Sequence, residues 1–564
     1  MRPSSSLVTP LFAVAAIAAA VPHEHCPLAQ TRNGTYEGVY SPEYDQDFFL
    51  GMPFAQPPVN DLRFRNPQSL NTSWHGSQPA VEYSPACVGY GSSQMGYEIS
   101  EDCLYLNVIR PAGVGPKQKL PILVWIHGGG FVQGSGVDLR YNMSFIVQQS
   151  QQMGQPIMAV TLNYRLSAFG FLQGYDEQDA SAGGNWGVRD QRLALHWIQE
   201  NVDAFGGDPD KVTIWGQSAG AGSVGLQITA YDGRDDGLFR SAIMDSGNPI
   251  FYGDMKQNYE PIYQNFTRQA GCGNSTDGLQ CLRDLPFDAL NDVLNTTEFS
   301  GAWTPQIDGD IIARYSSDQV ADGAFVKVPI IDGTNSDEGT SFAPEGLNTT
   351  KQFREALISD EGMNATFARA ILNAYPLFSP DNDLANLGPI DFVPLAYPYG
   401  TQWRRTTTYY TDSRFEANRR LTCQTWTFYG IPAYCYRFNA IPSWAGPYDG
   451  ATHFVEVAFA MKNLLGVGYP PVRSPPFQGL SKGYFELATL MSGDWVSFVA
   501  HGNPNKWDRA GVMASLQKRV PHWDKYADAV FQYEGNSTLR MRKDDWRQEG
   551  IDLINSANKE VYGR

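Results

Sequence analysis

Short apolar runs rich in β-branched residues alternate along this chain with longer segments that look helical. In residues 189–201, for example, leucine, tryptophan and isoleucine are interleaved with polar residues. This alternation predicts a mostly parallel sheet with helices on both faces, and residues 104–108 are expected to add an antiparallel strand at its edge. The parallel strands are predicted at residues 122–126, 157–162, 212–215, 242–244, 328–331 and 433–438.

Two long segments, residues 252–322 and 340–423, look helical and irregular rather than strand-rich. We interpret both as insertions that cover the top of the sheet, where a pocket would be shaped. No internal repeat or low-complexity linker divides the chain, so residues 21–564 are expected to form a single domain. Five prolines break the second segment into short pieces, namely Pro376, Pro380, Pro389, Pro394 and Pro398.

The N-terminus has the pattern of a secretory signal peptide. Arg2 precedes an apolar stretch over residues 7–20, which ends in three alanines suited to cleavage after Ala20. The stretch is too short to span a membrane, no later apolar run has the necessary length, and the polar residues 558–564 do not resemble a lipid-anchor tail. We therefore expect residues 1–20 to be removed and the mature protein to be secreted, extracellular and without a transmembrane segment.

Nine N-x-[ST] sequons agree with this route, because such acceptors are glycosylated on the surfaces of secreted proteins. Together with the signal peptide they predict a glycoprotein from a eukaryotic source. The acceptors are Asn33, Asn71, Asn142, Asn265, Asn274, Asn295, Asn348, Asn364 and Asn536.

The composition excludes some classes of function. A formal net charge of −17 argues against a protein that binds nucleic acid, because such a protein needs a basic face. We attribute the acidity to the solubility of an extracellular protein, and a hydrophobic content of 42% is ample for a large core. Residues 23–26 combine histidine, glutamate and cysteine, but they stand at a mature N-terminus that we expect to be mobile. No metal site is therefore predicted.

Residues 216–220 read Gly-Gln-Ser-Ala-Gly and directly follow the apolar run 212–215. A serine flanked by glycines, between a strand and a helix, is the nucleophile-elbow pattern. Bulkier residues in place of the glycines would collide with neighbouring strands, and the sharp turn leaves the serine where a base can reach it. Ser218 is therefore the candidate nucleophile, and the start of the helix supplies N–H groups to a developing oxyanion.

A run of three glycines, residues 128–130, comes directly after the predicted strand 122–126 and His127. Consecutive glycines at a strand end let backbone N–H groups turn inward with no side chain in the way. The run lies upstream of the elbow, in the order that the α/β-hydrolase layout requires. It is therefore the candidate oxyanion hole.

In that layout the acid and then the histidine follow the serine along the chain. Of the histidines well beyond Ser218, His501 lies in what reads as a helix end and turn, and His522 lies in a polar stretch. His453 instead follows the predicted strand 433–438 through a loop rich in glycine and proline. A loop after a late strand is where the base is expected, so His453 is the candidate.

The acid is expected in a loop after an intermediate strand, and the predicted strand 328–331 leads into such a loop. Three carboxylates lie there, and spacing alone does not choose among them. They are Asp332, Asp337 and Glu338.

With these motifs in order, the chain resembles the type-B carboxylesterases, the family that includes cholinesterases and the yeast-type triacylglycerol lipases. The resemblance covers nearly the whole mature chain and implies an α/β-hydrolase fold in a secreted, fungal-type carboxylesterase. The segments that carry it are residues 51–58, 62–64, 100–107, 127–131, 184–187, 190–191, 205–209, 216–220, 246–247, 337–339, 450–456 and 502–505.

The resemblance also implies a role for each site residue. The family's nucleophile falls on Ser218, its base on His453 and its acid on Glu338, and no metal or organic cofactor is required. The family's oxyanion donors fall on the backbone N–H groups of Gly129, Gly130 and Ala219.

Seven cysteines leave at least one unpaired in a monomer. The short spacings, together with the family's pattern, predict the bridges Cys87–Cys103 and Cys272–Cys281, in the oxidising compartment expected of a secreted protein. Cys423 and Cys435 are further candidate partners, which leaves Cys26 as the odd cysteine.

Two departures from the family bear on the substrate. Residue 217 is glutamine where many relatives have glutamate, which removes a negative charge beside the nucleophile. The loop closed by Cys87 and Cys103 is short, and residues 88–102 lack the tryptophan with which cholinesterases bind choline. In the yeast-type lipases a longer version of this loop is a lid, so the short loop points to an open-site esterase.

We therefore expect a serine carboxylic-ester hydrolase whose partner is a small-molecule ester of short to medium acyl chain. The sequence indicates no oligomeric state. One alternative is a triacylglycerol lipase or sterol esterase of the same family. The alternative from a different class is a non-catalytic adhesion module, and it is disfavoured because every catalytic position is occupied.

Overall fold

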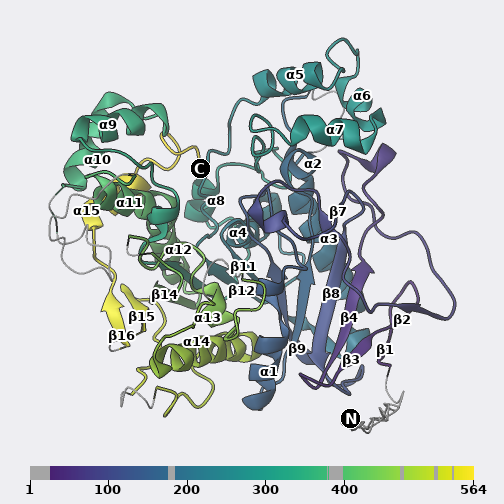
Figure 1. The fold of residues 1–564 in the computed structure, drawn as a ribbon. Coiled ribbons are helices and arrows are strands. Elements are labelled where there is room, and N and C mark those ends of the chain that lie inside the picture. The colour runs from purple at the N-terminus through teal and green to yellow at the C-terminus, as the bar shows by residue number, and fades with distance from the viewer. Residues whose placement is uncertain are drawn as a thin grey trace, which may run out of the picture.

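The computed structural model is built around a large mixed β-sheet (Figure 1). It describes residues 26–175, 184–377, 379, 398–446, 448–469, 475–513, 519–535 and 539–564. The predicted signal peptide, the sequon at Asn536 and the prolines at 380, 389 and 394 lie outside these residues.

The strand order of the sheet is β16-β15-β14-β13-β12-β11-β9-β10-β8-β4-β3. The strands from β10 to β15 in this order pair in parallel, whereas β16 at one end and β8, β4 and β3 at the other are antiparallel. The mostly parallel sheet of the α/β-hydrolase class is thus confirmed. The strands are β3 (Val39–Ser41), β4 (Gln46–Pro53), β8 (Tyr105–Pro111), β9 (Leu120–Ile126), β10 (Met158–Leu162), β11 (Gly207–Gln217), β12 (Ser241–Asp245), β13 (Ile330–Asn335), β14 (Ala433–Asn439), β15 (Ala529–Glu534) and β16 (Arg540–Lys543).

Helices cover both faces of this sheet, so side chains on both faces of its central strands are buried. In β9, Ile122, Val124 and Ile126 join one core cluster, while Leu123 and Trp125 join another, as expected of side chains that alternate across a strand. The first cluster includes side chains of α3 (Trp186–Asn201), α4 (Ala219–Gly233) and α12 (Ala417–Phe428), and the second includes α1 (Ser144–Gln152), α13 (Val457–Ala460) and α14 (Lys482–His501).

One strand prediction is wrong in its placement. Residues 104–108 were expected at the edge of the sheet, but β8 pairs with β10 on one side and with β4 on the other. β4 carries on to β3, which is the edge strand. The prediction failed because residues 46–53 were not assigned to a strand, and a strand with both neighbours present cannot be an edge.

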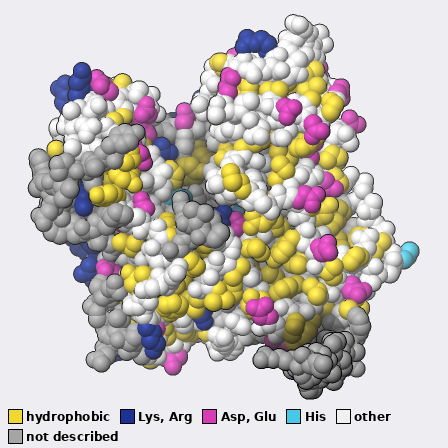
Figure 2. Space-filling view, viewed as in Figure 1, with side chains coloured by type: hydrophobic (Ala, Val, Ile, Leu, Met, Phe, Trp, Pro, Cys, Tyr) yellow, Lys and Arg dark blue, Asp and Glu magenta, His cyan; other side chains and the backbone are white. Residues whose placement is uncertain are grey.

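The two helical segments lie where insertions were expected. The first contains α5 (Glu260–Gln269), α6 (Gly278–Asp284), α7 (Phe287–Leu294) and α8 (Ser316–Asp322), and the second contains α9 (Thr350–Ser359), α10 (Ala365–Ala374) and α11 (Trp403–Thr411) before α12. The described parts of both segments contain no strand. In Figure 1 the helices α5 to α7 and α9 to α11 stand on opposite sides of the same end of the sheet, and Figure 2 shows a hollow between them.

Helices α9, α10 and α11 also have a small core of their own, which they share with α15 (Gln548–Asn555). Buried side chains of this core include Phe353, Tyr409 and Ile551. The remaining short elements are α2 (Ser167–Phe171), a sheet of β1 (Leu28–Gln30), β2 (Thr35–Glu37) and β5 (Ser77–Pro79), and the pair β6 (Ala86–Cys87) and β7 (Ile99–Ser100).

Three disulfides are present among the described residues. Cys87–Cys103 and Cys272–Cys281 are the pairs expected from the sequence, and Cys423–Cys435 joins α12 to β14. Cys26 is left as an exposed free thiol. Across the described part of the chain, no helix combines the length and apolar character needed to cross a bilayer, and no group of three or more potential metal-ligating side chains gathers.

Candidate active site

Ser218 lies at the tip of the turn between β11 and α4. Its backbone has φ 57° and ψ −126°, a conformation that is uncommon for a residue with a side chain and that signals local strain. The flanking glycines explain how the turn fits. A Cβ on Gly216 would lie 2.3 Å from the backbone of Gly220, and a Cβ on Gly220 would lie 2.1 Å from the carbonyl oxygen of Ile126. The elbow motif is thus dictated by contact between β9, β11 and α4.

The glycine run after β9 lies against this turn. A Cβ on Gly128 would lie 2.4 Å from the carbonyl oxygen of Gln217, so the loop and the elbow approach backbone to backbone. Gly129 and Gly130 have φ values of 107° and 66°, which favour glycine. Ala219 is the first residue of α4, and N–H groups in a first helical turn have no partner within the helix. Gly129, Gly130 and Ser218 line the same cavity, and Ala219 directly follows Ser218 in the chain.

His453 and Glu338 are in direct contact. Nδ1 of His453 lies 2.5 Å from Oε2 of Glu338, whose side chain is fully buried after β13. The other carboxylate oxygen, Oε1, accepts hydrogen bonds from the backbone N–H of Asn335, at 2.7 Å, and from the hydroxyl of Ser246. Both oxygens are therefore held, and the carboxylate has a defined orientation toward the imidazole.

The two other carboxylates of this loop, Asp337 and Asp332, have different surroundings. The side chain of Asp337 accepts a hydrogen bond from the backbone N–H of Ala451, at 2.7 Å, and so ties down the loop that carries His453. Asp332 is fully buried on β13, where burial raises the pKa of its carboxyl well above the usual value. Among the described residues, neither carboxyl oxygen of Asp332 has a hydrogen-bond partner. Of the three candidates, Glu338 is the one that contacts the histidine.

The two rejected histidines lie elsewhere. His501 is the last residue of α14, and His522 is exposed, with its Nε2 3.9 Å from Asp524. His127, before the glycine run, is fully buried and stacks on Tyr164 with ring centroids 4.4 Å apart. Burial lowers the pKa of His127 to about 4, so this side chain is a neutral part of the core.

Ser218 and His453 line one cavity of about 350 Å³, and the two insertions contribute part of its wall. Phe415 stacks on the His453 ring at 5.0 Å between centroids, and Phe342 meets the same ring edge-on at 4.9 Å. Tyr252 and Arg414 complete this side of the cavity. Sequence reasoning missed these residues, because no motif marks a pocket wall built from irregular insertions.

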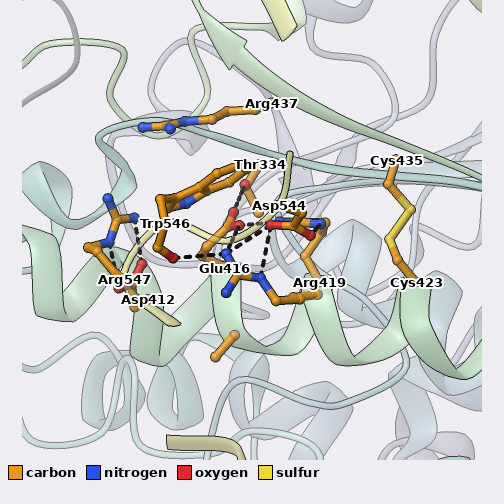
Figure 3. Close-up of polar contacts among 12 residues, drawn as sticks. Thr334, Asp412, Glu416, Arg419, Cys423, Cys435, Arg437, Asp544, Trp546 and Arg547 are labelled. Carbon is orange, nitrogen blue, oxygen red and sulfur yellow. Dashed lines mark hydrogen bonds and ion pairs between the residues drawn. A yellow bond between two sulfur atoms is a disulfide. The ribbon is translucent and has the colours of Figure 1, made fainter. Parts of the chain in front are cut away.

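Arg414 and Phe415 lie on a turn of π-helix, Asp412–Glu416, between α11 and α12. Such turns are rare and are frequent at functional sites. Buried ion pairs anchor both of its ends (Figure 3). Asp412 pairs with Arg547 at 2.7 Å, and Glu416 pairs with Arg419.

The same network reaches the sheet. Glu416 accepts a hydrogen bond from Thr334 of β13 at 2.5 Å, and Arg419 pairs with Asp544 at 2.5 Å. Figure 3 shows these contacts along one side of the helix, with the Cys423–Cys435 disulfide further along it. The π-helical turn is thus fixed to the strand that leads to Glu338, which sets the position of Phe415 against the histidine.

Two further carboxyls are buried behind the triad candidates. Burial raises the pKa of Asp245 to about 7, although Trp215 and Tyr436 donate hydrogen bonds to it. Burial, together with the negative charges of Glu338 and Asp245, raises the pKa of Glu456 well above its usual value. These shifts favour the uncharged forms of both groups.

Comparison with known proteins shows which family this chain matches. A model described as the carboxylesterase family matches residues 25–548. "Lipase 2" of Geotrichum candidum is 33% identical, with 90% of this chain and 91% of that protein covered. "Secreted triacylglycerol lipase LIP1" of Gibberella zeae is 30% identical over 93% of this chain and 89% of its own. The crystal structure of Aspergillus niger EstA superposes with a TM-score of 0.81 at 25% identity, covering 96% of this chain and 100% of that one.

Proposed function

Because the chain belongs to the carboxylesterase family and is a carboxylic ester hydrolase, we propose that it is a secreted serine esterase for short- to medium-chain esters. Ser218 is the nucleophile, His453 the general base and acid, and Glu338 the orienting acid. The observation that carries this assignment is the 2.5 Å contact between His453 and Glu338 beside a cavity that Ser218 also lines.

The first half of the reaction forms an acyl-enzyme. Nε2 of His453 takes the proton of the Ser218 hydroxyl as its oxygen attacks the ester carbonyl. The Nδ1–H group donates to Glu338, which fixes the tautomer and stabilises the positive imidazolium. The N–H groups of Gly129, Gly130 and Ala219 bind the oxyanion, and each such donor contributes about 3 kcal/mol to transition-state stabilisation in comparable sites.

The first half ends when His453 gives its proton to the departing alcohol. In the second half His453 takes a proton from water as the water oxygen attacks the acyl-enzyme at the same oxyanion site, and it returns that proton to the Ser218 oxygen as the carboxylic acid leaves. Gln217 lies next to the site of these proton transfers, because its side-chain nitrogen is 3.4 Å from Nε2 of His453. Its amide carries no charge, so the position adjacent to the nucleophile does not itself titrate.

The short disulfide loop supports an esterase with an open site. Residues of this loop are tied to the body of the protein, since the N–H of Tyr90 donates to Val132 at 2.7 Å and that of Ser93 donates to Gln133 at 2.9 Å. A loop that is held in this way is poorly suited to act as a moving lid. The second candidate is a triacylglycerol lipase, which is favoured by the lipases among the relatives.

Residues 21–564 form one catalytic domain in this proposal, and residues 1–20 are removed on secretion. Glycosylation at the sequons belongs to the same proposal. N-terminal sequencing of protein recovered from the medium tests the cleavage, and it should begin at Val21.

A fluorophosphonate probe tests the catalytic assignment. It should label Ser218 in the folded protein, and Ser218→Ala should abolish labelling and reduce turnover by several orders of magnitude. Absence of labelling in folded wild-type protein would instead favour a non-catalytic adhesion module.

A further inference from the structure

The charged side chains that line the cavity are basic. Arg140 and Arg414 both contribute to its wall, and no carboxylate does among the described lining residues. The residue before the nucleophile is the uncharged Gln217. This lining contrasts with the formal net charge of −17 of the whole chain. The net charge of the chain therefore does not account for the basic side chains of the cavity.

The positive charge of Arg140 is compensated by a neighbouring carboxylate. Its Nε lies 3.0 and 3.1 Å from the two carboxylate oxygens of Asp138, and its Nη2 lies 2.5 Å from one of them and 3.0 Å from the hydroxyl of Ser93. The guanidinium also covers the ring of Phe454 at 5.0 Å. Arg140 is thus paired closely with Asp138 and serves to hold the wall.

Arg414 is held much more loosely. Its ion pair with Glu361 is a single contact of 3.3 Å from Nη2, and its Nε has no hydrogen-bond partner among the described residues. The Arg414 side chain is 32% exposed, and the Glu361 side chain is 15% exposed. Glu361 holds this guanidinium by one long contact rather than by a bidentate pair, so it competes weakly for it.

Arg414 also stands close to the reaction centre. Its guanidinium carbon lies 5.7 Å from the centroid of the Phe342 ring, which itself lies 4.9 Å from the His453 ring. The next residue, Phe415, stacks directly on the histidine. One aromatic ring therefore separates the guanidinium from the catalytic base, and the anchored π-helical turn keeps that separation.

We propose that Arg414 binds a carboxylate of the substrate, so that the enzyme acts on esters that carry a free carboxylate, such as half-esters of dicarboxylic acids. A guanidinium is always charged and presents paired N–H donors that match a carboxylate. The separation through Phe342 suits a carboxylate a few carbon atoms from the scissile ester. This inference rests on the proposed function, because it names the substrate class of that same site.

The test compares kcat/KM for monoethyl glutarate with kcat/KM for ethyl pentanoate, which has a similar length and no charge. Arg414→Gln should lower the ratio of the two values by about tenfold, the effect expected when one charge-assisted hydrogen bond is lost. Glu361→Gln should raise the ratio, because it frees the guanidinium. Raising the salt to about 1 M, where the Debye length is about 3 Å, should lower the wild-type ratio.

Arg234→Gln is the matched control, since Arg234 also pairs with an acid, Asp236, but is outside the cavity. It should leave the ratio at the wild-type value. Thermal unfolding of each variant shows whether the fold is kept. Glu361→Gln tests the role of the Arg414 charge without altering the turn that carries Arg414.

The outcomes separate this inference from the proposed function. If Ser218 is labelled and ethyl pentanoate is hydrolysed, but Arg414→Gln and Glu361→Gln both leave the ratio unchanged, carboxylate recognition is wrong and the esterase assignment stands. If neither ester is hydrolysed and no label is taken up, the proposed function fails and this inference fails with it.

Discussion

Nδ1 of His453 lies 2.5 Å from Oε2 of Glu338, and the opposite carboxylate oxygen of Glu338 is occupied by Asn335 and Ser246. A carboxylate fixed in this way offers the histidine one hydrogen-bond direction. The ring is further confined by Phe415 and Phe342 on its sides. In the proposed mechanism the base is therefore oriented before substrate arrives, which lowers the free energy needed to reach the transition state.

We predict that Glu338→Gln removes most activity. A glutamine amide cannot stabilise the imidazolium and favours the wrong tautomer, and a comparable change in another triad lowers kcat by about 10⁴. Asp337→Asn and Asp332→Asn should lose little through the chemistry itself, because neither side chain contacts His453 in the way that Glu338 does. Steady-state kinetics on all three purified variants, with circular dichroism to check the fold, decides the assignment. A folded Asp337→Asn more impaired than Glu338→Gln would overturn it.

The contact between α4 and β9 predicts different outcomes for two glycines of the same helix. Gly220→Ala should fold poorly or lose activity, because its Cβ would lie 2.1 Å from the carbonyl oxygen of Ile126. Gly222→Ala is the control, since its nearest neighbour is a side-chain atom of Tyr252 at 3.4 Å. Alanine in a helix is favoured over glycine by about 1 kcal/mol, so this variant should be at least as stable as the wild type. Denaturation midpoints of the two variants give the comparison, and equal midpoints would contradict the close packing.

Asp245 predicts a specific dependence of stability on pH. Its folded pKa of about 7 lies above its ordinary value, because the carboxyl is buried. Between these two values the folded state holds a proton that the unfolded state has lost, so this group makes the free energy of unfolding fall as pH rises from about 4 to 7. The contribution is complete below that window and lost above it.

Asp245→Asn removes that titration. The free energy of unfolding of the variant, measured in urea at pH 4.5 and pH 8, should therefore change less than that of the wild type. Asp332→Asn should act in the same direction, since burial also raises the pKa of Asp332. Identical pH profiles for the wild type and both variants would show that the two carboxyls do not titrate differently on unfolding.

The elbow and the central strands could be predicted from the sequence because their signals are local. Ser218 needs a strand, a tight turn and a helix in immediate succession, and residues 212–228 contain all three in order. The acid could not be chosen in this way. Asp337 and Glu338 are neighbours in the chain, and only the side-chain contacts separate one that bonds to Ala451 from one that reaches His453.

The pocket wall was beyond the reach of sequence reasoning for a related reason. Arg414 and Phe415 enter the cavity from a π-helical turn, whose position depends on ion pairs with residues more than a hundred positions away, such as Arg547 and Asp544. The error in the predicted position of β8 has the same cause. A strand lies at the edge of a sheet only if it lacks a neighbour on one side, and its own composition does not reveal this. In both cases the missing information is tertiary.

The last prediction concerns hydrolysis at a lipid surface and the preference between choline esters and neutral esters. The Cys87–Cys103 loop is short and is bonded to the body through Tyr90 and Ser93, so no change of lid position should accompany contact with a lipid droplet. The rate of tributyrin hydrolysis should therefore rise smoothly through the solubility limit. Choline esters should be no better than neutral esters of the same acyl group, because the loosely paired Arg414 lines the cavity and the loop has no tryptophan platform. Rates across the solubility limit, beside matched thiocholine and neutral thioesters, measure both effects. A sharp increase at the emulsion point would favour the triacylglycerol lipase, and a strong preference for choline would contradict the cationic character of the pocket on which the carboxylate specificity also depends.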